Sequence, residues 1–171
     1  MNTILKLFFV LFFSCCVLAC HNQTDRKTLS QAEKAREDSL KIALNLKPYQ
    51  ATKLIPRADS VVKSWPIYEE LEIEVNRLEN YTLQDVLSNI STLHSVVDSL
   101  QETIPKAVDT FPVISRVNVL NTKAKHLMLL SEKQRPKLRD IKKMAEEYPF
   151  EFNNLKIQLN EVFIVLPEFG N

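Results

Sequence analysis

LQDVLSNISTLHSVVDSLQETI, residues 83–104, has an apolar seam whose members recur at alternating spacings of three and four residues. This is the heptad pattern of a helix that buries one face against other helices. Because the pattern covers three repeats, it predicts a long amphipathic helix. The seam consists of Leu83, Val86, Ile90, Leu93, Val97, Leu100 and Ile104.

The same apolar pattern extends upstream of this stretch. Pro66 stands just before the first of the upstream apolar residues, and proline is tolerated in the first turn of a helix. We therefore expect one helix over residues 66–104, about 60 Å long at about 1.5 Å per residue. Thr82 and Asp85 have the spacing of a capping pair, which leaves a start at residue 83 open. The upstream apolar residues are Ile67, Leu71, Val75 and Leu78.

Two further seams predict helices over residues 112–133 and 136–166. The last seam keeps its phase through Pro149, which we interpret as a kink and not as an end. A weaker stripe over residues 30–47 predicts a fourth helix. The fold class is therefore all-α, an elongated antiparallel bundle of three to four helices. The alternative is a long helical hairpin in which residues 112–166 form one kinked helix. The seams are Val113, Val117, Leu120, Ala124 and Leu127, and then Leu138, Ile141, Ala145, Tyr148, Phe152, Leu155, Leu159, Val162 and Leu166.

Charge is distributed unevenly along the chain. Residues 66–104 contain eight acidic residues and one basic residue, whereas residues 123–143 contain eight basic and two acidic residues. We expect complementary solvated faces, worth only about 0.2–1 kcal/mol per exposed pair; a charged surface kept for a partner is the alternative. Lys6 is the only charge in residues 1–19, so the remainder has 21 basic and 21 acidic residues. This balance argues against a nucleic-acid partner.

All three cysteines lie in residues 12–23, FFSCCVLACHNQ. A single positive charge and a short apolar run precede them, which is the layout of a secretory signal. The tetrapeptide Val17-Leu18-Ala19-Cys20 resembles the lipobox of bacterial lipoproteins. The resemblance implies that the thiol of Cys20 is lipidated and that Cys20 becomes the first residue of the mature chain. Several acyl chains then anchor the protein stably to a membrane.

The lipoprotein resemblance also sets the expected organisation of the chain. Residues 1–19 are the lipoprotein signal peptide, residues 20–30 the lipidated N-terminus and tether, and residues 31–171 a single helical-bundle domain. The expected location is the cell envelope. His21 follows the cysteine directly, and lipoproteins retained in the inner membrane of enteric bacteria resemble one another in having Asp at that position. In a Gram-negative host we therefore expect the outer membrane, with the protein facing the periplasm.

No pattern in the mature chain indicates catalytic, metal-binding or cofactor-binding residues. Its single glycine, Gly170, excludes phosphate loops built on glycines. Ser91 and Lys123 stand three residues before His94 and His126, so the Glu-x-x-His pairs of di-iron bundles are missing. We interpret both histidines as boundary residues of buried faces. The expectation is a protein without enzyme activity, metal or cofactor.

Three Asp-Ser-aliphatic tripeptides are centred on Ser39, Ser60 and Ser99. They resemble the acceptor sequence of envelope O-glycosylation in Bacteroidota. Glycosylation at these serines is a hypothesis, and helix patterning alone is the alternative origin of the three copies.

Three functions fit these observations. The first is a membrane-anchored, monomeric interaction or structural module that holds an envelope protein on the exposed faces of residues 66–104 and 112–143. The second is a periplasmic ligand-binding or stress-sensing helical bundle. The third is an inhibitor or immunity lipoprotein that blocks an envelope-active enzyme.

Overall fold

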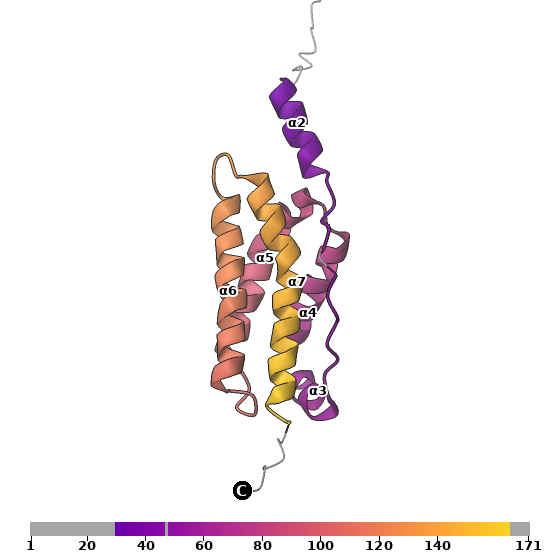
Figure 1. Cartoon of the computed structure of the whole chain (residues 1–171). Coiled ribbons are helices and arrows are strands. Elements are labelled where there is room, and N and C mark those ends of the chain that lie inside the picture. The colour runs from indigo at the N-terminus through magenta and orange to yellow at the C-terminus, as the bar shows by residue number, and fades with distance from the viewer. Residues whose placement is uncertain (1–29, 47, 165–171) are drawn as a thin grey trace, which may run out of the picture. The chain divides into compact units, whose positions relative to one another are not determined.

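The computed structural model describes residues 30–46 and 48–164 (Figure 1). The regular secondary structure of this part of the chain is helical, apart from one isolated antiparallel bridge between Ala43 and Thr82. The chain divides into two units, residues 1–33 and residues 34–171, and the bundle belongs to the second. The predicted all-α fold class is confirmed. The helices are α2 (Gln31–Leu40), α3 (Pro56–Lys63), α4 (Pro66–Arg77), α5 (Leu83–Glu102), α6 (Phe111–Ser131) and α7 (Leu138–Glu161).

Helices α4 to α7 form the bundle, and consecutive helices run in opposite directions (Figure 1). Helix α5 packs against α4 and α6, and α7 packs against α6 and α4. The predicted seams face the core as far as the structure describes them, and full burial of a Leu, Val or Ile side chain there contributes about 1.5–3 kcal/mol. Leu166, the last residue of the third predicted seam, lies outside the described residues. Buried residues of the three long helices include Leu83, Val86, Ile90, Leu93, Val97 and Leu100, then Val113, Val117, Leu120, Ala124 and Leu127, then Ile141, Ala145, Tyr148, Phe152, Leu155 and Leu159.

The prediction of one helix over residues 66–104 is wrong, because the chain turns between α4 and α5. The 3-10 turn η1 (Leu78–Asn80) follows α4, and Thr82 caps α5. The Thr82 hydroxyl accepts a hydrogen bond from the Asp85 N–H at 3.3 Å, and the Asp85 carboxylate accepts one from the Thr82 N–H at 2.8 Å. This reciprocal capping box gives partners to two backbone donors and fixes the helix start.

The long-hairpin alternative is also wrong. Residues 132–137 form a turn between α6 and α7, and the two helices pack side by side. The helix predicted over residues 112–133 agrees with α6 to within two residues at its end.

Helix α7 is shorter than the predicted 136–166. It begins at Leu138, and after Glu161 the backbone tightens, since the N–H of Phe163 donates to the carbonyl of Asn160 at 3.0 Å. Pro149 lies inside α7 and is buried, and the helix continues past it, as predicted. Its ring removes one backbone hydrogen bond, which the surrounding core packing offsets.

An extended segment, described over residues 41–46 and 48–55, links α2 to α3 and lies along α7 (Figure 1); we call it the strap. The helix predicted over residues 30–47 therefore ends early, at Leu40. The N–H of Leu44 donates to the carbonyl of Tyr81 at 2.9 Å, and the N–H of Leu83 donates to the carbonyl of Ile42 at 3.0 Å. The second bond satisfies a donor that the first turn of α5 leaves without a helical partner.

Side chains of α7 hold the rest of the strap by its backbone. Three polar residues of α7, each seven positions after the last, face it and accept hydrogen bonds from strap N–H groups. These side chains give partners to three strap N–H groups that no sheet neighbour supplies. The bonds are Asn45 N–H to Glu146 at 2.7 Å, Thr52 N–H to Asn153 at 2.7 Å and Ile55 N–H to Asn160 at 2.9 Å.

Candidate functional site

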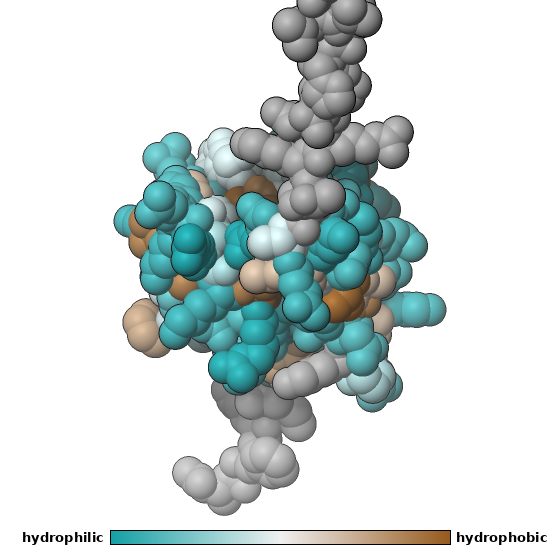
Figure 2. All heavy atoms as spheres, turned by 90° about the horizontal axis from the view of Figure 1, so that it is seen from above, coloured by the Kyte–Doolittle hydropathy of each residue, from teal (hydrophilic) through white to brown (hydrophobic). Residues whose placement is uncertain are grey.

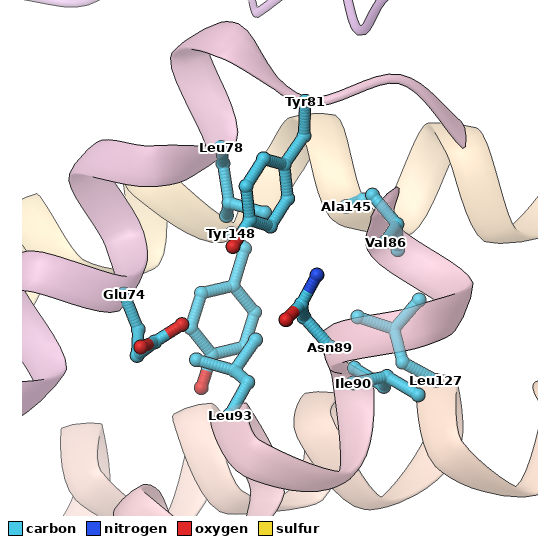
Figure 3. A pocket seen from close by; sticks show the side chains of 10 residues that line it. All are labelled: Glu74, Leu78, Tyr81, Val86, Asn89, Ile90, Leu93, Leu127, Ala145 and Tyr148. Atoms are coloured by element: carbon cyan, nitrogen blue, oxygen red, sulfur yellow. The ribbon is translucent and has the colours of Figure 1, made fainter. Parts of the chain in front are cut away.

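The interior of the bundle is closely filled. A cavity of about 10 Å³ lies among α4, α5, α6 and α7, and its lining side chains, including Asn89 and Tyr148, surround it closely (Figure 3). A cavity of this size has room for about one water molecule. It is therefore far too small for an organic ligand.

The polar groups around this cavity have structural partners. The hydroxyl of Tyr148 donates to the backbone carbonyl of Leu120 at 3.2 Å, and burial raises the pKa of Tyr148. Glu74, which is buried, pairs with Arg77 one turn further along α4. At neutral pH the Tyr148 phenol is thus a fixed donor within the core, and Glu74 is already paired.

The outer surface has larger concave sites than the cavity in the interior. Viewed along the bundle it is mainly hydrophilic, and the apolar side chains lie in separate small patches (Figure 2). A groove of about 510 Å³ lies between α5 and α6. We call it the amide groove, because three of its lining side chains are amides. It is lined by Asp98, Gln101, Asn118, Asn121, Thr122, Lys125, His126 and Leu129.

Hydrogen bonds between α5 and α6 order the floor of the amide groove. The Gln101 amide nitrogen donates to Asn118 at 3.0 Å, and the Asn121 amide nitrogen donates to Gln101 at 2.6 Å and to Asp98 at 3.1 Å. These side chains are at least partly exposed, so their remaining donor and acceptor sites face solvent. The floor is thus held in place and still able to bind.

The chemistry of the amide groove matches a polypeptide backbone. Each Asn or Gln amide offers a carbonyl acceptor and an NH₂ donor, the same two groups that a peptide bond offers. Leu129, 49% exposed, supplies an apolar contact at the α6 side. Asp98 and Lys125 have opposite charges, so the groove has no strong net charge.

The two oppositely charged stretches do not neutralise each other through ion pairs in the described part of the chain. The ion pairs that join bundle helices lie elsewhere: Lys123 of α6 contacts Glu147 at 3.3 Å and Glu151 at 3.1 Å on α7, and Lys156 of α7 contacts Glu72 of α4. The outward faces of α5 and α6 are therefore left for solvent or a partner.

The predicted lipidation site, Cys20, and the lipobox residues Val17, Leu18 and Ala19 lie outside the described residues. None of the helices that the structure describes is both long and apolar enough to cross a bilayer.

The three candidate glycosylation serines lie on separate helices and are not brought together. Ser60 on α3 is exposed, whereas Ser39 on α2 and Ser99 on α5 are half-buried. The Ser39 hydroxyl also donates to the carbonyl of Ala35 at 2.7 Å. Ser60 is therefore the most accessible of the three acceptors.

The two histidines of the bundle lie on different helices and do not belong to a cluster of metal-binding side chains in the described part of the chain. His94 on α5 is half-buried and His126 on α6 is exposed in the amide groove. Among residues 30–46 and 48–164, His, Cys, Asp and Glu form no group of three or more that could hold a metal ion.

The sequence pattern predicted an interaction surface on the exposed faces of residues 66–104 and 112–143 but did not indicate the hydrogen-bonded amides of the amide groove. The available signal was the repetition of amides beside the buried seams, with Gln101 next to Leu100 and Asn121 next to Leu120. Which amides meet depends on the register of α5 against α6, which the sequence pattern does not give.

Comparison with known proteins adds no assignment: no family model, curated protein or solved structure matches this chain.

Proposed function

We propose that the protein is a lipid-anchored module of the cell envelope that holds a segment of a protein partner in the amide groove, without catalysis of its own. The lipobox at Cys20 supplies the anchor in this proposal, and the bundle supplies a rigid binding face.

The observation that carries the proposal is the amide groove itself. It is open, it is about 510 Å³ in volume, and its amide floor is fixed by hydrogen bonds between two packed helices. A pre-ordered polar floor lowers the entropy lost on binding, and unused amide groups reward a peptide backbone that pairs with them. The filled interior favours this surface over an internal ligand site.

The partner's own features follow from the groove. Leu129 calls for an apolar side chain on the partner, and the near-neutral lining calls for a segment without strong net charge. We therefore expect binding that depends weakly on salt, unlike binding by a charged patch.

Crosslinked co-purification from native membranes tests the proposal. Full-length protein, the non-lipidated Cys20→Ser variant and the groove variant Leu129→Glu are compared. Leu129→Glu places a charge where the partner's apolar contact would lie, and a loss of about 1.4 kcal/mol lowers affinity about tenfold. We expect a specific envelope protein with wild type and at least about tenfold less of it with Leu129→Glu.

Ile73→Glu is the matched control. Ile73 lies on α4, away from the groove, and is 46% exposed, close to the 49% of Leu129. It should recover as much partner as wild type. If Leu129→Glu recovers as much partner as Ile73→Glu, the groove is not the binding face. Equal recovery with Cys20→Ser would show that the anchor is dispensable for binding.

A further inference from the structure

A second concave site lies between the strap, α3, α4 and α7, whereas the amide groove lies between α5 and α6. The second site has a volume of about 530 Å³, within the usual range of about 300–1,000 Å³ for small-molecule sites. It shares no residue with the amide groove. Strap residues form one wall, including Thr52 and Leu54, and Val62 of α3 adds an apolar contact. We call it the strap cleft.

Tyr68 of α4 lines the strap cleft with a polar group that has no partner. Tyr68 is 2% exposed, and its ring packs against Trp65 and Phe152, with ring centres 5.8 and 5.5 Å away. Its hydroxyl is buried and makes no hydrogen bond with any described residue. Leaving such a group unpaired costs about 1–3 kcal/mol. A ligand that offers an acceptor would recover this free energy.

The surroundings of Tyr68 keep its hydroxyl protonated. Burial raises the pKa of Tyr68, and the negative charges of Glu72 and Asp59 raise it further. Tyr68 and both of these acidic residues line the strap cleft. The phenol therefore keeps its proton at neutral pH and is a donor to whatever occupies the site.

Six charged side chains line the strap cleft, three of each sign. Four of them form two ion pairs. The other two, Lys53 on the strap and Glu69 on α4, have no ion-pair partner among the described residues and are exposed. The paired residues are Asp59 with Lys63, at 2.6 Å, and Glu72 with Lys156.

We propose that the strap cleft binds a zwitterion of the amino-acid or short-peptide class. Its ammonium group pairs with Glu69, its carboxylate pairs with Lys53, and a carboxylate or carbonyl oxygen accepts the Tyr68 hydroxyl. A ligand of one net charge would pair with only one of these two exposed side chains, whereas a zwitterion can pair with both. This site goes beyond the proposed partner groove and depends on neither the partner nor the anchor.

Calorimetric titration of the full-length protein in detergent tests the proposal. The probes are free leucine, whose side chain would contact Leu54 and Val62, and triglycine; N-acetyl-leucinamide is the uncharged control. We expect saturable heat with leucine or triglycine and none with the capped analogue. Leucine alone would identify a free amino acid, and triglycine alone a peptide.

Two variants and a matched control assign the binding to the cleft. Tyr68→Phe and Glu69→Gln should each weaken binding at least about tenfold, whereas Glu70→Gln, changed at the next residue and outside the cleft lining, should leave it unchanged. Tyr68→Phe should not lower the urea midpoint and should raise it, since the lost hydroxyl is a buried group without a partner among the described residues. The proposal is overturned if neither zwitterion binds, if the capped analogue binds equally, or if Tyr68→Phe binds as well as wild type.

Discussion

Replacing Asn160 by alanine should loosen the strap and destabilise the fold. The Asn160 side chain is buried, accepts the N–H of Ile55 at 2.9 Å and donates to the carbonyl of Lys53 at 2.9 Å. Alanine leaves both backbone groups without these partners. At about 0.5–1.5 kcal/mol for each hydrogen bond, the free energy of unfolding should fall by about 1–3 kcal/mol.

Urea unfolding followed by circular dichroism measures this change, with Asn154→Ala as the control. Asn154 lies on the same helix, and its side chain bonds to Glu151 of that helix, at 3.2 Å, and to no strap residue that the structure describes. Both variants replace asparagine by alanine on the same helix, so the difference between them reports mainly the strap contacts of Asn160. We expect Asn154→Ala to change stability by less than about 0.5 kcal/mol.

Hydrogen exchange gives the local readout. In Asn160→Ala the amide of Ile55 should lose its protection, because its acceptor is gone. If Asn160→Ala costs no more than Asn154→Ala, or if the Ile55 amide stays protected, the side chains of α7 do not hold the strap and the reasoning is refuted.

Further predictions concern the cap of α5 and the core. Thr82→Ala should lower the unfolding free energy by about 1 kcal/mol in urea, through loss of the capping box; an unchanged midpoint would argue against the cap. Hydrogen bonds from the Thr82 side chain and backbone hold the pKa of Asp85 below its ordinary 3.8, so its stabilising effect is present above that pH and lost as pH falls through the lowered pKa. Asp85→Asn should therefore flatten the acid side of a plot of urea midpoint against pH, and an identical plot would contradict this. Tyr148→Phe removes the bond to Leu120 and should cost about 0.5–1.5 kcal/mol by thermal unfolding, unless that bond is absent in solution.

The parts of the fold that were predictable from sequence are those fixed by local periodicity. The seams of α5, α6 and α7 are buried as expected, because a 3/4 spacing on a helix defines one face whatever its neighbours are. The continuation through Pro149 followed from the same rule, since the apolar phase is kept on both sides of it.

The break between α4 and α5 was predictable only in part. The apolar spacing lengthens to five residues between Leu78 and Leu83, which a single helix face does not accommodate. The Thr82 and Asp85 pair stands at that point, and its hydrogen bonds outweigh the apolar continuity that favoured one helix from residue 66. A change of apolar spacing that coincides with a capping pair therefore indicates the start of a new helix, even where apolar residues continue upstream.

The strap was not predictable from periodicity, because an extended segment held by side-chain-to-backbone bonds needs no repeating pattern of its own. The sequence signal for the strap lies on α7, where Glu146, Asn153 and Asn160 recur every seven residues beside the buried seam. The strap cleft forms only because the strap packs against α7, since strap residues such as Lys53 make one of its walls. Sites built by such long-range contacts follow from tertiary structure and not from spacing along the chain.

Site-specific photocrosslinking in native membranes tests the central claim, that the amide groove holds a protein partner, most directly. A photoreactive residue at Thr122, an exposed position of the groove, is compared with one at Ile73 on α4. We expect one discrete adduct with an envelope protein from position 122, lost when Leu129→Glu is added, and no such adduct from position 73. The same adduct from both positions, or none from position 122, would contradict it.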